Sequence, residues 1–238
     1  QHTVRDLMAL GITPDVLVCR SKKPLSFEAR KKLAIFCHVN QSAVMSAHDV
    51  SNIYRVAIGL DEQGLRNVLC KHFNTRKPLP NDLEQWVSLA EQVDNSKSPI
   101  RIAMVGKYTG LSDSYLSVIK ALQHAAHQLN RKVEINWIEA EKLENSEEMV
   151  WNKLSNSKGI LVPGGFGDRG IEGKILAANY ARTKGIPYLG ICLGLQIAVI
   201  EVSRNKLNKK LANSTEFNPD TPDPVVINMP DVSNTIMG

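Results

Sequence analysis

Three short apolar runs in the second half of the sequence are each followed by a helical pattern, and this alternation limits the possible folds most strongly. The runs are IRIAMVG (100–106), GILVP (159–163) and PYLGI (187–191). Helices are predicted after them over 115–129, 172–184 and 195–205. Strands that alternate with helices are typical of a parallel sheet covered by helices. We therefore predict an α/β fold whose second half is a three-layer parallel sheet flanked by helices.

The first half mixes strands and helices less regularly. Strands are predicted over 15–19 and 43–47, and helices over 27–37, 54–60 and 64–73. The polar segment EQVDNSKSP (91–99) is typical of a linker. The prediction is thus an α/β part at 1–90, a linker at 91–99 and a second α/β part at 100–238. The first part is similar to the end of a larger domain whose beginning is missing.

Charge and composition narrow the class of ligand. The net charge of +5 suits anionic small molecules or nucleic acid. Nucleic acid is disfavoured because aromatic residues are only 5% and do not alternate with basic ones. A basic cluster from Lys22 to Lys32 is either a solvated helix face or a set of phosphate contacts.

Apolar runs and cysteine spacing bear on the location. No run of 18 apolar residues or secretory pattern occurs in the sequence, so no membrane association is expected. The four cysteines form no CxxC pair, which argues against disulfides and a zinc site. A reduced, cytoplasmic location is therefore expected.

Cys192 stands between two glycines where an apolar run meets a helical one. The pattern Gly190-Ile191-Cys192-Leu193-Gly194 follows the logic of a nucleophile elbow, in which small residues relieve crowding at a tight strand-to-helix turn. The helix N-terminus favours the thiolate, and the N–H of Leu193 is placed to donate to an oxyanion. The alternative is a small buried cysteine with a packing role.

The glycine-rich loop PGGFGDRGIEG follows the neighbouring predicted strand. We assign a second oxyanion donor to Gly165, with Gly164 beside it, because glycine lets the backbone turn its N–H groups toward a site. The alternative is an ordinary glycine-rich connection. Ligands of parallel sheets bind at the carboxyl ends of the strands, where this loop and Cys192 both lie. Their combination favours catalysis.

These motifs carry a family resemblance over nearly the whole chain. PGGFGDRGIEGK, GICLGLQ, ANSTEF and VGKYTGLSDSYLSVIKAL resemble the class I glutamine amidotransferase domain of the CTP synthase family. QHTVRDLMALGITPDVLVCR, FCHV and HDVSNIY are similar to the closing part of that family's synthetase domain, and PVVINMPD leans toward its eukaryotic branch.

The resemblance implies a reaction and a set of ligands. Glutamine is hydrolysed at the cysteine through a thioester, and the ammonia aminates UTP that ATP and Mg²⁺ have activated at O4. GTP is implied as the activator, CTP as a feedback inhibitor, and a homotetramer, with filaments, as the assembly.

The resemblance also implies roles for particular residues. Cys192 is the nucleophile, and Glu216 holds the amino group of the substrate. The implied glutamine contacts are Gly164, Gly165, Leu193, Gly194, Leu195 and Gln196. The implied nucleotide contacts are Gln1 and Lys32 for UTP or CTP, and Arg20, His48, Asp49 and Val50 for ATP.

The sequence lacks one part of the family pattern. The family supplies its general base from a His-x-Glu motif downstream of the elbow, yet none of the six histidines follows Cys192. We expect the catalytic His and Glu beyond Gly238, and the phosphate-binding loop and magnesium carboxylates before Gln1. The chain alone is therefore predicted to have no glutaminase turnover. His124 and His127 are predicted to be surface residues rather than metal ligands.

Two other functions stay open at this point. A stand-alone cysteine hydrolase would use the same elbow but would leave the first half of the chain without a role. A non-catalytic assembly or regulatory module derived from the enzyme would fit a chain without the base.

Overall fold

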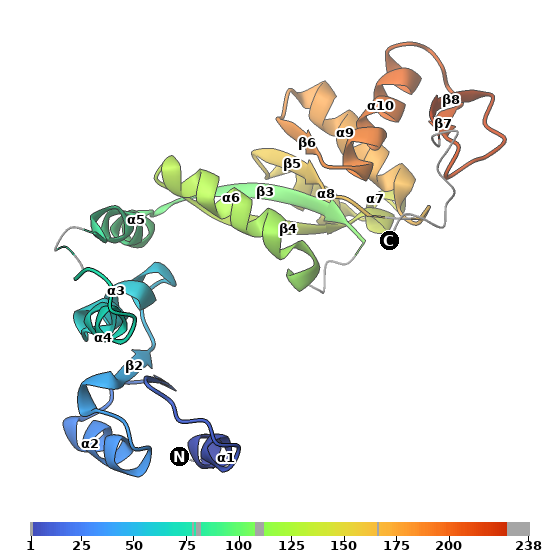
Figure 1. The fold of residues 1–238 in the computed structure, drawn as a ribbon. Coiled ribbons are helices and arrows are strands. Elements are labelled where there is room, and N and C mark those ends of the chain that lie inside the picture. Colours follow the sequence, from blue (N-terminus) through green and yellow to red (C-terminus); the bar gives the residue numbers. More distant parts are fainter. Residues whose placement is uncertain (1, 78, 80–81, 108–111, 166, 228–238) are drawn as a thin grey trace. The chain divides into compact units, whose positions relative to one another are not determined.

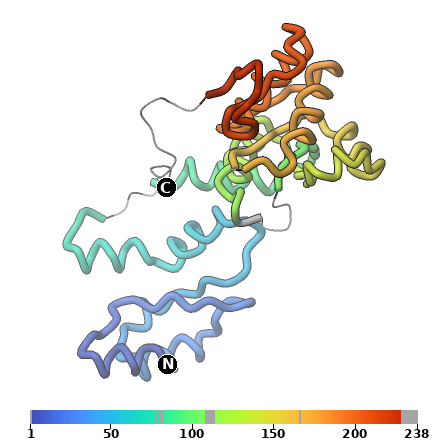
Figure 2. Tube along the Cα trace, turned by 90° about the vertical axis from the view of Figure 1, so that its right-hand side faces the viewer, coloured from blue at the N-terminus to red at the C-terminus, as the bar shows by residue number. Residues whose placement is uncertain are grey.

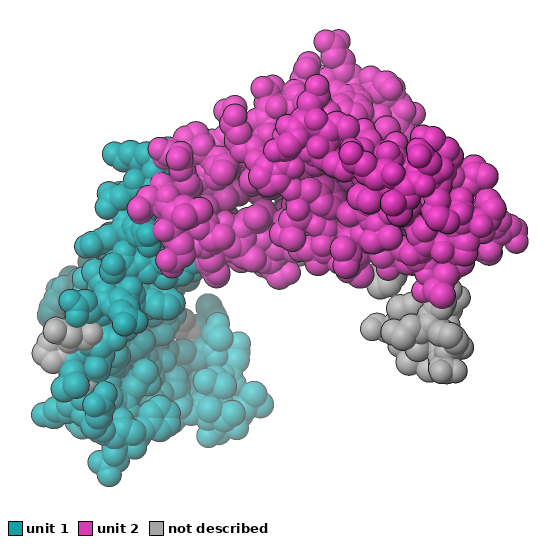
Figure 3. Space-filling model, turned by 90° about the horizontal axis from the view of Figure 1, so that it is seen from above, with its two compact units in different colours: residues 1–97 teal, residues 98–238 magenta. Residues whose placement is uncertain are grey.

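A computed structural model describes residues 2–77, 79, 82–107, 112–165 and 167–227. The chain divides into two compact units, Gln1–Lys97 and Ser98–Gly238, which Figure 3 colours separately.

The first unit contains a two-stranded parallel sheet. Strands β1 (Leu17–Ser21) and β2 (Val44–His48) lie within two residues of their predicted positions. They pair with Val18 opposite Met45. Its helices are α1 (His2–Ala9), α2 (Phe27–Phe36), α3 (Tyr54–Glu62), α4 (Leu65–His72) and α5 (Glu84–Asn95), with a 3₁₀ turn η1 (Gln41–Ala43). The side chain of Ser26 accepts a hydrogen bond from the N–H of Ala29 and caps α2. Helices α1 and α5 were not predicted.

The segment predicted as a linker, 91–99, contains the boundary between the two units but consists mostly of helix and strand. Residues 91–95 are the last part of α5, strand β3 begins at Ser98, and only 96–97 lie between them. Helix α5 is anchored on α3, because the indole N–H of Trp86 donates to the carbonyl of Tyr54 at 2.7 Å. The polar composition of the segment therefore reflects the solvent-facing side of a helix.

The second unit is built on a four-stranded parallel sheet in the order β4-β3-β5-β6. The strands are β3 (Ser98–Gly106), β4 (Arg131–Glu139), β5 (Gly159–Val162) and β6 (Tyr188–Gly190). Because all four run in the same direction, their carboxyl ends meet at one edge. The predicted parallel sheet is confirmed.

Helices cover both faces of this sheet (Figures 1 and 2). After the 3₁₀ turn η2 (Ser112–Tyr115), α6 (Leu116–Gln128) packs on a cluster that includes Met104 and Leu161. Their sequence neighbours Ala103 and Ile160 face the opposite side, as alternation along a strand requires. That side is covered by α7 (Ala140–Glu144), α8 (Glu148–Ser155) and α9 (Ile171–Lys184).

The last helix forms a further apolar cluster with α9. Helix α10 (Leu193–Asn205) packs against α9 through Leu193, Ile197 and Ile200. A short parallel pair, β7 (Ala212–Ser214) and β8 (Asp223–Val226), lies beside α10 (Figure 1).

Two residues near the end of α6 differ in exposure from the prediction. Leu129 was placed on the apolar face but is 73% exposed, because the helix ends at Gln128. His124 is exposed as predicted, whereas His127 is half-buried. The Nδ1 atom of His127 is buried without a hydrogen-bond partner in the described part of the chain, and this burial lowers its pKa.

Candidate active site

Cys192 occupies the turn between β6 and α10 and is exposed to solvent. Its backbone angles, φ 54° and ψ −110°, lie where residues other than glycine are rarely found. The turn is fixed by two backbone hydrogen bonds, from Ile191 N to Val162 O at 3.0 Å and from Gly194 N to Ile191 O at 2.9 Å. The structure therefore confirms a strained strand-to-helix elbow that presents the thiol.

Both glycines of the elbow are required by close backbone contacts. A Cβ built on Gly190 would lie 2.3 Å from the carbonyl carbon of Gly194, and one on Gly194 would lie 2.1 Å from the carbonyl oxygen of Val162. Such distances are much shorter than van der Waals contact. Helix α10 can therefore begin this close to β5 and β6 only because Gly190 and Gly194 have no side chains.

We expect Gly194→Ala to destabilise the protein by about 1–3 kcal/mol, because the new methyl group forces the elbow away from β5. Gly59→Ala is the matched control, since a methyl group on that helical glycine would meet nothing within 4 Å. The control is expected to be neutral or to stabilise by up to about 1 kcal/mol. Urea unfolding of both variants measures the difference, and equal effects would contradict the packing explanation.

The glycine loop after β5 lies against the elbow. A Cβ on Gly164 would be 3.4 Å from the Cβ of Cys192 and 3.9 Å from its Sγ, while one on Gly165 would be 3.7 Å from Leu193 Cδ2. Within the described residues, no hydrogen bond involves the backbone N–H of Gly164, Gly165 or Leu193. The predicted neighbours thus come together, and their N–H groups remain available to a ligand.

The first turn of α10 also contains a buried polar atom without a partner in the described part of the chain. The N–H groups of Leu195 and Gln196 both donate to the carbonyl of Cys192, at 3.0 Å and 3.3 Å. The side-chain oxygen Oε1 of Gln196 is buried and has no hydrogen-bond partner among the residues described. A buried acceptor without a donor is costly, so it suits a ligand that brings an N–H group.

Glu216 lies on a tight turn after β7 and is exposed. Its backbone N–H donates to Ser214 Oγ at 3.2 Å, and the neighbouring Phe217 packs against the cluster that contains Leu193. The packing of Phe217 holds this turn beside α10.

Tyr188 was missed as a support of the elbow. Its hydroxyl donates to the carbonyl of Gly194 at 2.8 Å and so joins β6 to the first turn of α10. Burial raises its pKa, so the hydroxyl stays protonated as a donor. No sequence signal distinguished this tyrosine from an ordinary core aromatic residue.

Lys174 was also missed, although it is only 3% exposed. It lies in the first half of α9, close enough to Lys107, Glu144 and Arg169 for their charges to affect its own. Burial, with smaller repulsion from Lys107, lowers its pKa from 10.5 to about 8. The available signal was a single lysine within the otherwise apolar stretch GKILAA, most of which is buried in the structure.

We expect Lys174→Met to stabilise the protein at pH 7 by about 1–2 kcal/mol, since the folded wild type then holds a buried ammonium. Between pH 8 and 10.5 the folded protein loses this proton before the unfolded chain does, so wild-type stability gains with rising pH. The advantage of the variant should therefore shrink over that window. Chemical unfolding at several pH values measures it, and a difference independent of pH would contradict the burial of a charged amine.

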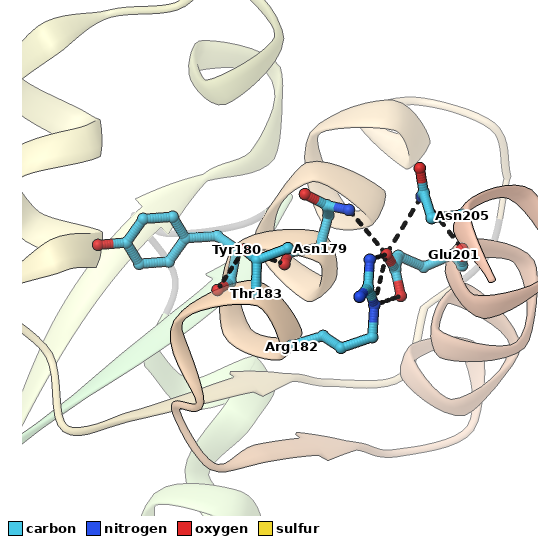
Figure 4. Close-up of polar contacts among 6 residues, drawn as sticks. All are labelled: Asn179, Tyr180, Arg182, Thr183, Glu201 and Asn205. Carbon is cyan, nitrogen blue, oxygen red and sulfur yellow. Dashed lines mark hydrogen bonds and ion pairs between the residues drawn. The ribbon is translucent and has the colours of Figure 1, made fainter.

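A buried carboxylate holds α9 and α10 together farther along both helices (Figure 4). Glu201 is 2% exposed and accepts hydrogen bonds from Arg182 Nη2 at 2.8 Å, Asn179 Nδ2 at 2.8 Å and Asn205 Nδ2 at 3.1 Å. Burial disfavours its charge, but the bonds from Arg182 and Asn179 outweigh burial and hold the pKa of Glu201 below its ordinary value. The cluster joins the helix after the glycine loop to the helix after Cys192.

The predicted nucleotide residues lie in the first unit, and part of the set comes together. Arg20 in β1 forms an ion pair with Asp49, just after β2, and the strand register places Ser21 opposite His48. Val50 follows at the surface.

The other two nucleotide predictions lie apart from this group. Lys32 is exposed on α2. Gln1 lies outside the described residues. The parts of the chain that the structure describes contain no cluster of three His, Cys, Asp or Glu side chains fit for a metal ion. No helix there is both long and apolar enough to span a bilayer.

Two family descriptions match this chain, one in each unit. The description "Glutamine amidotransferase class-I" matches residues 110–231, and "CTP synthase N-terminus" matches residues 1–75.

Named relatives cover the whole chain. A CTP synthase of Dictyostelium discoideum is 50% identical over 100% of this chain and 46% of its own length. CTP synthase 2 of Rattus norvegicus is 48% identical, and a CTP synthase of Methanosarcina acetivorans is 46% identical, each over 97% of this chain. The eukaryotic leaning stays a prediction, because these identities are similar. The chain spans less than half the length of these relatives.

A solved structure is similar to part of this chain. The glutaminase domain of a Trypanosoma brucei CTPS with bound acivicin superimposes with a TM-score of 0.53 and 42% identity. The match covers 57% of this chain and 53% of that one.

Proposed function

Because this chain belongs to the class I glutamine amidotransferase family, we propose that Cys192 is the nucleophile that releases ammonia from glutamine. The observation that carries this proposal is the contact between Gly164 and Cys192 at the N-terminus of α10. It gathers, at one edge of the sheet, an exposed thiol and three backbone N–H groups that have no hydrogen-bond partner within the described residues. A cysteine with only a packing role would need neither an exposed thiol nor nearby N–H groups without partners.

The reaction uses these groups in sequence. The thiolate of Cys192 attacks the carboxamide carbon of the glutamine side chain, and the carbonyl oxygen becomes an oxyanion. The N–H groups of Leu193 and Gly165, with Gly164 beside them, stabilise that charge. The C–N bond then breaks, the nitrogen leaves with a proton as ammonia, and water hydrolyses the resulting thioester to glutamate.

The proton acceptor is not assigned to a residue of this chain. No histidine follows Cys192 in the sequence, and we propose that the base comes from the His-x-Glu motif that the resemblance implies. The chain by itself is thus predicted to react once with a glutamine-like electrophile but not to turn glutamine over.

The remaining glutamine contacts bind and orient the substrate. Glu216 pairs with its amino group through a charge-assisted hydrogen bond. The unpartnered oxygen of Gln196 takes a further N–H donor, and Gly194 and Leu195 line the same turn of α10.

For the whole protein we propose the activity of a CTP synthase. The ammonia would displace phosphate from UTP that ATP has phosphorylated at O4, in a domain to which residues 1–75 belong. Because that match covers most of the first unit, a stand-alone hydrolase is the weaker alternative. Gln1 and Lys32 would contact UTP or CTP, and Arg20, His48, Asp49 and Val50 would contact ATP.

Regulation and assembly are further parts of this proposal. GTP would activate the glutaminase step, CTP would inhibit, and the protein would act in the cytoplasm as a homotetramer that also forms filaments. Mg²⁺ would accompany ATP, but the described residues offer no cluster of ligands for it, so no step on this chain is assigned to the metal.

Labelling of the chain with acivicin tests the glutaminase site directly. We expect Cys192 to be alkylated before the other three cysteines, with a rate that saturates as the reagent concentration rises, because the amino acid must bind first. Peptide mapping after partial reaction identifies the modified residue. First modification of Cys19, Cys37 or Cys70, or a rate that never saturates, would contradict the proposal.

A further inference from the structure

We propose that Arg204 is a positioning residue that fixes the Glu216 turn relative to the glutamine site, an inference that rests on the proposed function. Arg204 lies near the end of α10, and its side chain is 18% exposed. Its Nε donates to the carbonyl of Ala212 in β7 at 2.8 Å. Its Nη1 donates to both carboxylate oxygens of Glu172, at 3.0 Å and 2.7 Å.

One side chain therefore joins three segments of the site. Helix α10 begins at the elbow, and Glu172 lies in the first turn of α9, directly after the glycine loop. Ala212 begins the strand that leads to Glu216. The planar guanidinium can hold two partners at fixed angles, which a lysine ammonium cannot.

The chain between Ala212 and Glu216 is stiff enough to transmit this constraint. Ala212 and Ser214 are both buried. The carbonyl of Ser214 accepts from Phe217 N at 3.2 Å and from Asn218 N at 2.9 Å, and Thr215 N donates to Val226 O at 3.0 Å. A shift of Ala212 is thus passed on to Glu216 instead of being absorbed by a flexible loop.

The consequence is specific to the amino acid end of the substrate. Glu216 would bind the amino group, whereas the thiol and the oxyanion donors belong to the elbow and the glycine loop. Displacement of the β7 turn should therefore weaken binding of an amino acid ligand and leave the intrinsic reactivity of Cys192 unchanged.

Two electrophiles separate these effects in the full chain. Acivicin carries an amino acid group, whereas iodoacetamide alkylates the thiol without one. We expect Arg204→Ala and Arg204→Lys to raise the acivicin concentration for half-maximal rate by about 10- to 100-fold, the equivalent of losing a charge-assisted contact. The maximal acivicin rate and the iodoacetamide rate at Cys192 should not change.

Two further variants define the comparison. Glu172→Gln leaves the bond from Arg204 to Ala212 in place, so its effect should be smaller than that of Arg204→Ala. Arg101→Ala removes an exposed pair with Glu134 between β3 and β4 and should have no effect. Circular dichroism confirms folding, and Arg204→Lys, which keeps the charge, serves if the alanine variant unfolds.

The outcomes are distinct. Unchanged acivicin saturation in the Arg204 variants would overturn the proposal, as would parallel slowing of both reagents, which indicates general disruption. If wild-type Cys192 reacts with iodoacetamide but shows no saturation with acivicin, the proposed glutamine site is wrong, and the Arg204 proposal is overturned with it.

Discussion

We expect Cys192→Ala, in the complete protein, to abolish CTP formation from glutamine and to preserve CTP formation from added ammonia. The thiolate acts only in ammonia release, so its loss should lower the glutamine-dependent rate by about 10⁴-fold or more. The nucleotide contacts proposed here all lie in the first unit and do not include this residue. Assays with glutamine and with ammonium chloride at saturating UTP and ATP measure the two activities separately.

Cys70→Ala is the matched control for this experiment. Cys70 is a half-buried cysteine in α4, outside every proposed contact, and its variant should keep both activities. Equal loss of both activities in a correctly folded Cys192→Ala protein would contradict the assignment of Cys192 as the nucleophile.

Arg182→Ala should destabilise the second unit by about 3–5 kcal/mol. The reason is that removal of one partner from a buried pair leaves Glu201 charged in a site that is only 2% exposed. Asn179 and Asn205 would still donate to it, but neither supplies a positive charge. Guanidinium unfolding followed by circular dichroism measures the change.

An exposed arginine pair gives the control. Arg101→Ala breaks a contact of 3.1 Å with Glu134, where both side chains are about half exposed, and should cost at most about 1 kcal/mol. If Arg182→Ala and Arg101→Ala lower the stability by similar amounts, the Glu201 cluster does not hold α9 and α10 together.

The Arg182 pair also sets a pH dependence. Because the folded pKa of Glu201 lies below its ordinary value of 4.5, its stabilising contribution is full above that value and is lost as pH falls through the folded pKa. In Arg182→Ala the largest lowering hydrogen bond is gone, so the stability difference from wild type should narrow in acid.

The local chemistry around Cys192 could be read from the sequence. Two glycines flanking a cysteine at a strand-to-helix junction suffice to predict the elbow, because only glycine tolerates the contacts of 2.1 Å and 2.3 Å that a Cβ would make there. The alternation of apolar runs and helices likewise determined the parallel sheet, and thereby the shared edge at which Gly164 and Cys192 meet.

The helical part of the predicted linker shows where local composition misleads. Residues 91–95 carry the polar side of a helix whose opposite side is buried at Ala90. No single window of sequence shows that Trp86 and Asp94 bind Tyr54 and Arg55 of α3. The helical state of this segment is decided by contacts with residues more than thirty positions earlier in the chain.

The sequence by itself thus determined the sheet, the elbow and the glycine loop, because each depends on backbone sterics and on neighbours along the chain. Only the tertiary structure decided which polar side chains support them. The contacts of Arg204 with Glu172 and of Arg182 with Glu201 each join α9 to α10. Lys174 is buried, which its place in the sequence does not show. Charged residues in a helix look alike in sequence whether they face solvent or a partner, since only packing removes the water around them.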